Sequence, residues 1–405
     1  MSLANGRPYL AIPGPSTMPD RVLGAMHRGA PNIYEGKLIE ETAQIVADLK
    51  RVALCSSNVA IYIGNGHAAW EAVNTNLFSR GDKVLVLATG RFGMNWARGL
   101  SELGVDVEIL DFGLQSPADP DRVSERLRAD RGHTIKAVLI CQTDTASSIR
   151  SDVAALRGAI DAAAHPALFG VDCIASLGCD MFRFDDWGVD VMVSGSQKGL
   201  MTPPGLGFVW FNDKALAASK TADLRTPYWN WEPRATPEQY WQHFNGTAPT
   251  HHLFGLGEAL RMILDEEGLE AVWARHTALA GATHAAFAHW GQGHDIALNV
   301  ADPRARSHSV TAARIGNGGA GRLRKWCEDQ AGVTLGIGLG MAEPDAPNYG
   351  DFLRVAHMGH VNAHMTLGVL AVMEAGMIAL DIPHTAGGAT AAARVVAAAT
   401  RNHGL

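Results

Sequence analysis

A carboxylate and an amine in this chain, those of Asp172 and Lys198, could act together in chemistry on amino groups. Asp172 ends the apolar run 167–172, and Lys198 follows 26 positions later in the small polar segment 193–199, Val-Ser-Gly-Ser-Gln-Lys-Gly. A carboxylate at the end of one buried strand can keep a pyridinium nitrogen protonated, and a lysine beyond another can form a Schiff base. Burial and neighbouring cations lower the pKa of such a lysine and make it a nucleophile. We therefore predict a pyridoxal phosphate site; the alternative is a strand-end aspartate and a solvated lysine without a chemical role.

A glycine turn before a predicted helix is a second candidate site. Residues 62–71 read Tyr-Ile-Gly-Asn-Gly-His-Ala-Ala-Trp-Glu, so Asn65, Gly66 and His67 stand where the helix begins. Free backbone amides and the helix dipole at such a junction favour a phosphate. The segment has neither the lysine of a P-loop nor a completed dinucleotide glycine pattern, so it fits a single phosphate better than a nucleotide. His67 fits a cofactor contact and an ordinary helix-start residue equally well.

Arg354 is a cation in an apolar setting. It lies in the strand-like run 352–356, Phe-Leu-Arg-Val-Ala. A long buried cation requires an anionic partner, and the planar guanidinium binds carboxylates through two parallel hydrogen bonds. We predict that Arg354 binds a substrate carboxylate and is not a surface ion-pair residue.

The elements that must position these residues alternate along the chain. Short apolar runs are separated by longer stretches with helical spacing, which is typical of βαβ units. The runs are 83–88, 107–112, 135–141, 167–173, 190–194 and 207–211, and the helical stretches include 70–78, 122–129 and 152–163, with Asp152 as an N-cap. The pattern predicts an α/β fold with a mostly parallel sheet covered by helices on both faces.

The pattern changes beyond residue 220. Residues 221–250 are rich in aromatic residues and proline and are predicted to form a long functional loop or arm. A helix is expected over 256–275, followed by a second, smaller α+β unit. The apolar stretch 365–382 contains Glu374 and Asp381 and predicts a buried helix rather than a membrane span. The alanine-rich tail, 386–399, also predicts a helix.

Composition narrows the classes of partner. The chain has 405 residues, a formal charge of −7 and 47% hydrophobic residues, which excludes disordered and fibrous proteins. It has no concentrated basic stripe of the kind that binds nucleic acid. We expect small-molecule partners, no nucleic acid and no membrane.

The cysteines and histidines argue against disulfide and metal chemistry. The five cysteines are odd in number and form no CxxC pair, so we expect reduced, structural thiols and a cytoplasmic protein without a secretory leader. The histidine pairs 251–252 and 357/360 lack an HExxH-type pattern, so no metal site is predicted.

Six segments together carry a family resemblance. They are 12–19 Ile-Pro-Gly-Pro-Ser-Thr-Met-Pro, 64–67 Gly-Asn-Gly-His, Asp172, 196–198 Ser-Gln-Lys, 203–205 Pro-Pro-Gly and 354–359 Arg-Val-Ala-His-Met-Gly. In this order the chain resembles, over nearly its whole length, class V of the fold-type I pyridoxal-phosphate aminotransferases, in particular the alanine–glyoxylate and serine–glyoxylate group. The resemblance implies an N-terminal active-site segment (1–20), a large domain (21–275) with a mostly parallel seven-stranded sheet between helices, and a smaller C-terminal α+β domain (276–405).

The resemblance also implies roles for individual residues. Lys198 would form the internal aldimine and Asp172 would pair with the pyridinium nitrogen. The remaining cofactor contacts would be Asn65, Gly66, His67 and Gln197 on the phosphate side, Phe92 against the ring, Thr145 near the 3′-oxygen, and Thr247 reaching the neighbouring subunit's phosphate. Arg354 would hold the substrate carboxylate beside Gly14 of the opening segment. Such sites imply a homodimer that shares its active sites.

The sequence departs from the family pattern at two places. Segment 32–36, Asn-Ile-Tyr-Glu-Gly, replaces a His-Arg-Ser-Pro-like segment near the substrate, which makes Tyr34 a candidate for a different donor pocket. Phe244 stands where relatives often carry a tyrosine, so one phosphate hydrogen bond is lost. Segments 32–36, 266–276 and 357–359 are also similar to pyridoxamine–pyruvate aminotransferase, although that relative has a glutamate where Asn65 lies.

The resulting hypothesis is a transaminase of ping-pong mechanism. It would move an amino group from a small amino acid, such as serine or alanine, to a 2-oxo acid, glyoxylate or pyruvate. The alternatives are a pyridoxamine–pyruvate-type activity, a lyase such as a cysteine desulfurase, and a non-catalytic scaffold. The lyase would need a cysteine in a mobile C-terminal loop, whereas Cys327 lies in a predicted helix.

Overall fold

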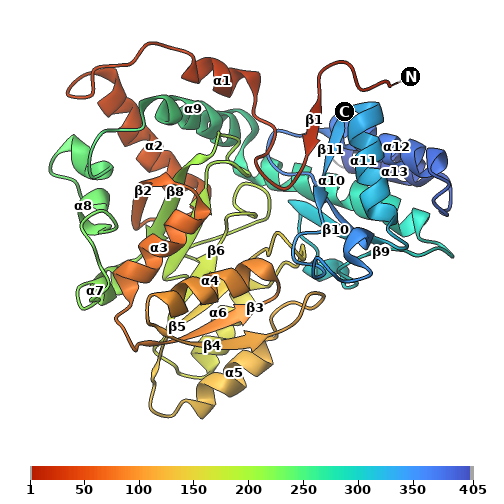
Figure 1. The fold of residues 1–405 in the computed structure, drawn as a ribbon. Helices are drawn as coiled ribbons and strands as arrows, with labels where there is room; N and C mark the ends of the chain where they lie inside the picture. Colours follow the sequence, from red (N-terminus) through yellow and green to blue (C-terminus); the bar gives the residue numbers. More distant parts are fainter. Residues whose placement is uncertain (1, 402–405) are drawn as a thin grey trace.

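A seven-stranded sheet forms the centre of the larger part of the molecule (Figure 1). The structure is a computed structural model that describes residues 2–401. The strand order is β2-β8-β7-β6-β5-β3-β4, with β2 (Asn58–Gly64), β3 (Lys83–Ala88), β4 (Asp106–Asp111), β5 (Ile135–Cys141), β6 (Leu168–Asp172), β7 (Val191–Gly195) and β8 (Gly205–Phe211). Only β8 runs antiparallel to its neighbours. The predicted mostly parallel sheet is confirmed.

Both faces of this sheet are buried under helices. Along β3, Leu85 and Leu87 belong to one hydrophobic core, and the alternating Val84 and Val86 belong to the other. The first core also contains residues of α2 (Lys37–Ala53), α5 (Pro120–Ala129), α6 (Val153–Ala162) and α9 (Thr250–Arg261), and the second those of α3 (Gly66–Leu77), α4 (Arg91–Glu102) and α7 (Asp213–Ser219). The expected N-cap of α6 is confirmed, because Asp152 accepts a hydrogen bond from Ala155 N at 3.0 Å. Continuously apolar strands are what such two-sided burial requires.

A smaller five-stranded sheet lies beside the larger one, in the order β1-β11-β12-β10-β9. Its strands are β1 (Tyr9–Ala11), β9 (Ile296–Leu298), β10 (Val310–Ile315), β11 (Val333–Ile337) and β12 (Phe352–Ala356), packed with α10 (Leu269–Trp290), α11 (Gly319–Ala331), α12 (Ala363–Ala379) and α13 (Gly388–Arg401). The N-terminal strand β1 pairs parallel with β11. The boundary at residue 275 stays a prediction, since that residue lies inside α10. Helix α1 (Asp20–Met26) follows the N-terminal segment.

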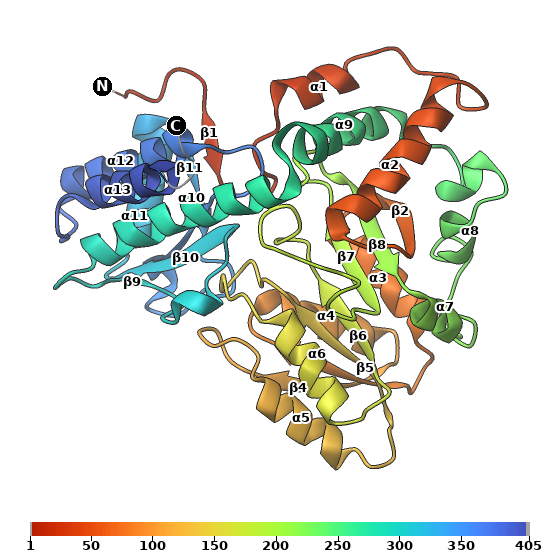
Figure 2. The same ribbon diagram turned by 180° about the vertical axis from the view of Figure 1, so that it is seen from behind.

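The predicted helix over 256–275 is wrong. Helix α9 ends at Arg261, a π-helical turn covers Met262–Glu267, and α10 begins at Leu269. Between them Gly268 has φ +85°, which an α-helix does not allow. Figure 2 shows α10 leaving the end of α9 beside the larger sheet and running along the helices of the smaller one. The helical spacing of residues 256–275 therefore continues across the junction between two separate helices.

Segment 221–250 is irregular, as expected, apart from α8 (Glu232–Ala235) and a short 3₁₀ turn (Tyr240–His243). Its anchor is Arg234, whose side chain is 1% exposed. The guanidinium donates hydrogen bonds to the carbonyls of Ile61, Tyr228 and His243 and stacks 4.3 Å from the Tyr62 ring. The arm is thus fastened to the outer strand β2 by one buried cation.

The remaining sequence expectations concern thiols and membrane spans. All five cysteines are buried and unpaired. The stretch 365–382 is largely helix α12, and no helix within residues 2–401 has the length and apolarity to cross a membrane.

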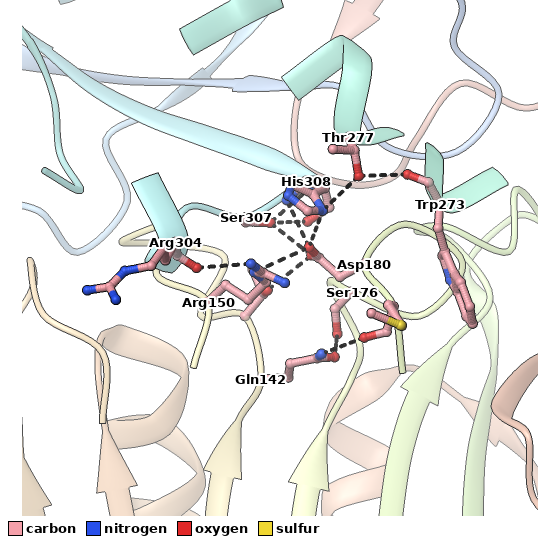
Figure 3. Close-up of polar contacts among 12 residues, drawn as sticks. Gln142, Arg150, Ser176, Asp180, Trp273, Thr277, Arg304, Ser307 and His308 are labelled. Atoms are coloured by element: carbon pink, nitrogen blue, oxygen red, sulfur yellow. Dashed lines mark hydrogen bonds and ion pairs between the residues drawn. The ribbon is translucent and has the colours of Figure 1, made fainter. Parts of the chain in front are cut away.

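The two sheets are joined by a buried carboxylate, Asp180 (Figure 3). Asp180 follows β6, and its side chain is fully buried. It accepts hydrogen bonds from His308 N (3.0 Å) and Ser307 Oγ (3.2 Å), which precede β10 of the smaller sheet. On the larger side it accepts from Thr143 Oγ1 (3.4 Å) and lies 3.7 Å from Arg150 Nε. One carboxylate therefore satisfies polar groups from both parts of the chain.

We predict that Asp180→Ala lowers the free energy of unfolding by about 3–5 kcal/mol, because it leaves buried donors and a cation without their acceptor. Urea denaturation monitored by circular dichroism measures this loss. Asp186→Ala is the matched control, since Asp186 pairs with Arg183 on the surface; its effect should be below about 1 kcal/mol. Equal losses in the two variants would contradict the role given to Asp180.

Candidate active site

Lys198 lies in the turn that follows β7, where that turn meets the N-terminal segment. Its Nζ donates a hydrogen bond to the carbonyl of Pro13. Ser16 fastens the same turn, donating from Oγ to Lys198 O (2.7 Å) and from its backbone N to Gln197 O (2.9 Å). Burial, reinforced by the positive charge of Arg354, lowers the pKa of Lys198 to about 8, whereas Asp172 acts in the opposite direction. The amine is therefore much closer to its neutral, nucleophilic form at physiological pH than an exposed lysine is.

Gly14 is in contact with Lys198. A Cβ at position 14 would lie 2.5 Å from both Nζ and Cε of that lysine, and Gly14 has φ +107°. Space and backbone conformation both require glycine here. The structure thus brings the predicted substrate-binding Gly14 and the predicted catalytic Lys198 together.

Asp172, at the carboxyl end of β6, is held by three protein donors. Ile174 N donates to Oδ1 (2.6 Å), Trp70 Nε1 donates to Oδ2 (2.9 Å), and Cys141 Sγ lies 3.6 Å from Oδ2. Burial raises the pKa of Asp172 to about 7, although these donors oppose the rise. The carboxylate is therefore a base whose strength depends on its hydrogen bonds.

The glycine turn places backbone donors beside Gln197. Asn65 caps α3, its Oδ1 accepting from His67 N (3.0 Å) and Ala68 N (3.3 Å). Within residues 2–401 the buried Oε1 of Gln197 has no hydrogen-bond partner. A Cβ at Gly195 would lie 3.0 Å from that oxygen and 3.7 Å from Gly66 N. The structure thus gathers Gln197 and the start of α3 around one small space.

Arg354 lies on β12 and is 6% exposed. Its Nε donates to Ile337 O (2.7 Å) and its Nη1 to Thr145 O (2.9 Å). No hydrogen bond from Nη2 to another residue of the described chain 2–401 is found, so this donor is available to a ligand. Burial lowers the pKa of Arg354 to about 10, which leaves the guanidinium charged at neutral pH.

Asp144 connects Thr145 with Phe92. The Asp144 carboxylate accepts hydrogen bonds from Phe92 N (2.8 Å), Gly93 N (3.1 Å) and Ala146 N (3.0 Å). The Phe92 ring, half-buried, lies edge-on to Trp70 at 6.4 Å between centroids. Asp144 therefore holds the backbone of Phe92 close to Thr145, although the two predicted residues are far apart in the sequence.

Tyr34 and Thr247 lie differently from the other predicted residues. Tyr34 is 85% exposed and Thr247 is also exposed. Neither side chain forms a hydrogen bond with Lys198, Asp172 or Arg354 among the described residues. Phe244 is buried and packs against Tyr240 and His243.

Sequence reasoning missed four residues that complete the site: Pro13, Trp70, Cys141 and Asp144. Cys141 and Asp172 are paired in register at the ends of the neighbouring strands β5 and β6. The predicted ends of these two strands could therefore have indicated Cys141 as a neighbour of Asp172. Trp70 lies in the first turns of α3, where helical spacing indicates only that it is buried.

The chain is similar to a known protein family and to named relatives. The family described as Aminotransferase class-V matches residues 14–357. The serine–glyoxylate aminotransferase of Methylorubrum extorquens is 35% identical over 96% of this chain and 95% of its own length. The L-aspartate–glyoxylate aminotransferase of Paracoccus denitrificans is 34% identical over 95% and 94%, respectively.

A solved structure has a similar fold. The pyridoxamine–pyruvate aminotransferase of Mesorhizobium loti is 25% identical and superposes with a TM-score of 0.88, covering 98% of this chain and 100% of its own.

We predict that Gly14→Ala displaces the Lys198 side chain and lowers the free energy of unfolding by about 1–3 kcal/mol, because a strained backbone adds to a collision with Nζ. Thermal and urea unfolding measure the loss, and a crystal structure shows whether Lys198 still contacts Pro13. Gly24→Ala in α1 is the control, because no atom lies within 4 Å of a Cβ there. A Gly14→Ala protein as stable as this control would contradict the requirement for glycine.

Proposed function

The chain belongs to the aminotransferase class-V family, and from that premise we propose that it uses pyridoxal phosphate to transfer an amino group from a small amino acid to glyoxylate. The observation that carries the proposal is the half-buried Lys198 and the buried Asp172 at the ends of β7 and β6, with an available donor on Arg354. The names of the two relatives share glyoxylate and differ in the amino donor, serine or L-aspartate. The acceptor is therefore better supported than the donor.

The residues present fit the cofactor. A carboxylate accepts about four hydrogen bonds, and Asp172 accepts three from the protein, so Oδ1 keeps a position for the pyridinium nitrogen. Gln197 would donate from its Nε2 to the phosphate, and the amino end of α3, with Asn65, Gly66 and His67, would supply the other donors. Lys198 would bind the aldehyde carbon.

Further residues would complete the cofactor site. Phe92 would lie against the ring and Thr145 near the 3′-oxygen. We further propose a homodimer in which Thr247 of the partner subunit reaches the phosphate. The exposure of Thr247 on an arm fixed by Arg234 supports this arrangement.

When bound, pyridoxal phosphate supplies an electron sink for the negative charge that develops at the substrate's Cα. Once the substrate's amine has displaced it, Lys198 would take the proton from the substrate's Cα at Nζ and give it to the former aldehyde carbon of the cofactor; with the oxo acid it would carry a proton in the reverse direction. Asp172 holds the proton on the ring nitrogen through its negative charge. Arg354 binds the α-carboxylate through Nη2, which fixes the orientation of the Cα–H bond. Donor and acceptor would share these contacts, which requires that they bind in turn, a ping-pong order.

Free pyridoxamine is a second candidate amino donor. The structural similarity to pyridoxamine–pyruvate aminotransferase favours it, with pyruvate as acceptor. A cysteine desulfurase-type lyase is not proposed, because Cys327 is buried within α11 and packs in the core of the smaller sheet.

We predict that the purified protein loaded with pyridoxal phosphate has an absorbance band that depends on Lys198, that one amino acid converts this band to a second band at shorter wavelength, and that glyoxylate restores the first. Serine, alanine, aspartate and pyridoxamine are each added alone, with pyruvate as the alternative acceptor. Lys198→Ala is the control and should neither show the first band nor turn over. A wild-type protein that binds no pyridoxal phosphate would overturn the proposal.

We predict that Arg354→Gln lowers kcat/KM about 100-fold for the amino donor and for the oxo acid alike, because both lose the same charged hydrogen bond. Steady-state kinetics with each substrate varied in turn measure the effect. Arg304→Gln serves as the matched control, since Arg304 is 91% exposed. A loss confined to one substrate would show that the two carboxylates do not share Arg354.

A further inference from the structure

Among the described residues, Trp70 donates the hydrogen bond that reaches the Asp172 carboxylate from a helix. It lies on α3, is 4% exposed, and donates from Nε1 to Asp172 Oδ2 at 2.9 Å. The other two donors to this carboxylate come from the sheet side: Ile174 follows β6, and Cys141 ends β5. Trp70 is therefore the residue through which α3 contacts the carboxylate.

The Trp70 ring is itself immobilised. It stacks on Trp96 with a centroid distance of 5.7 Å and an angle of 6° between the planes, and Phe92 and His67 lie against it at 6.4 Å and 4.6 Å. The indole N–H of the neighbouring Trp96 donates to Asn74 Oδ1 at 2.9 Å and not to Asp172. Only one indole N–H of this stack is directed at the carboxylate.

We propose that Trp70 is a positioning residue that holds the Asp172 carboxylate so that Oδ1 faces the cofactor's ring nitrogen. The inference rests on the proposed function. Because Oδ2 is occupied by Trp70 and Cys141, the position left by the protein is on Oδ1, beside the bond from Ile174 N. Without the indole N–H the carboxylate gains freedom to rotate and loses a donor that favours its charged form.

Other titratable groups also face Asp172. The charges of Asp144 and Lys198 act on it, and the thiols of Cys141 and Cys173 adjoin it with pKa values raised well above the ordinary value by burial. His67 lies against the Trp70 ring, and burial lowers its pKa. Since Lys198 titrates near Asp172, the carboxylate is best followed where that lysine is absent.

The test is a titration of Asp172 in the full-length apoprotein. Aspartate labelled with ¹³C at Cγ is incorporated into Lys198→Ala, and the Asp172 signal is identified by its loss in Asp172→Asn. We expect Trp70→Phe to move the midpoint upward by about one pH unit, because one hydrogen bond to the charged form is lost. Trp96→Phe, which also exchanges a tryptophan in the same stack, should leave the midpoint within about 0.3 units.

A second variant guards against a packing effect. Site-specific replacement of Trp70 by 3-benzothienylalanine keeps the ring's shape and exchanges only the N–H for sulfur, so it should reproduce the upward shift. An unmoved midpoint in both Trp70 variants, or an equal shift in Trp96→Phe, would overturn the proposal.

The cofactor provides a separate readout in the protein with Lys198 intact. There, Trp70→Phe should weaken pyridoxal phosphate binding severalfold, whereas Trp96→Phe should not; unchanged binding in Trp70→Phe would count against the proposal. A wild-type protein without affinity for the cofactor would refute the proposed function, while the apoprotein titration would still decide whether Trp70 controls Asp172.

Discussion

The site depends on the burial of an amine and a carboxylate at the ends of two adjacent parallel strands. Burial disfavours charge on both, which lowers the pKa of Lys198 to about 8 and raises that of Asp172 to about 7. Buried polar groups of this kind are stable in a protein only when they form hydrogen bonds. Lys198 donates to the carbonyl of Pro13, and Asp172 accepts from Ile174, Trp70 and Cys141.

The partners come from both sheets, so the two parts of the chain must be fixed relative to each other. Strand β1 belongs to the smaller sheet. In the segment that follows β1, Gly14 and Ser16 contact the turn that carries Lys198. Arg354 reaches back in the other direction from β12 to the carbonyl of Thr145. Asp180 joins the same two parts through buried hydrogen bonds. The interface between the two parts of the chain therefore positions both the Arg354 guanidinium and the Lys198 amine.

The same arrangement explains why the reaction class is better determined than the substrate. Lys198, Asp172 and Arg354 would act on groups that every α-amino acid and 2-oxo acid share, and relatives with serine and aspartate as donors have about one-third identity over nearly the whole chain. Donor choice rests on the shape of the remaining pocket, where a difference of one methylene changes binding by about 1–3 kcal/mol.

The amino-acid sequence by itself determined the alternation of strands and helices, the positions of Lys198 and Asp172 at strand ends, and the cap at Asp152, because these depend on local periodicity and on residue type. It also carried the family resemblance. Tertiary structure decided the rest. The break at Gly268 was hidden within a helical pattern, and the indole of Trp70 carries no local sign that its N–H meets a carboxylate 102 positions away. Contacts of this kind follow from strand order and helix packing, which local spacing does not specify.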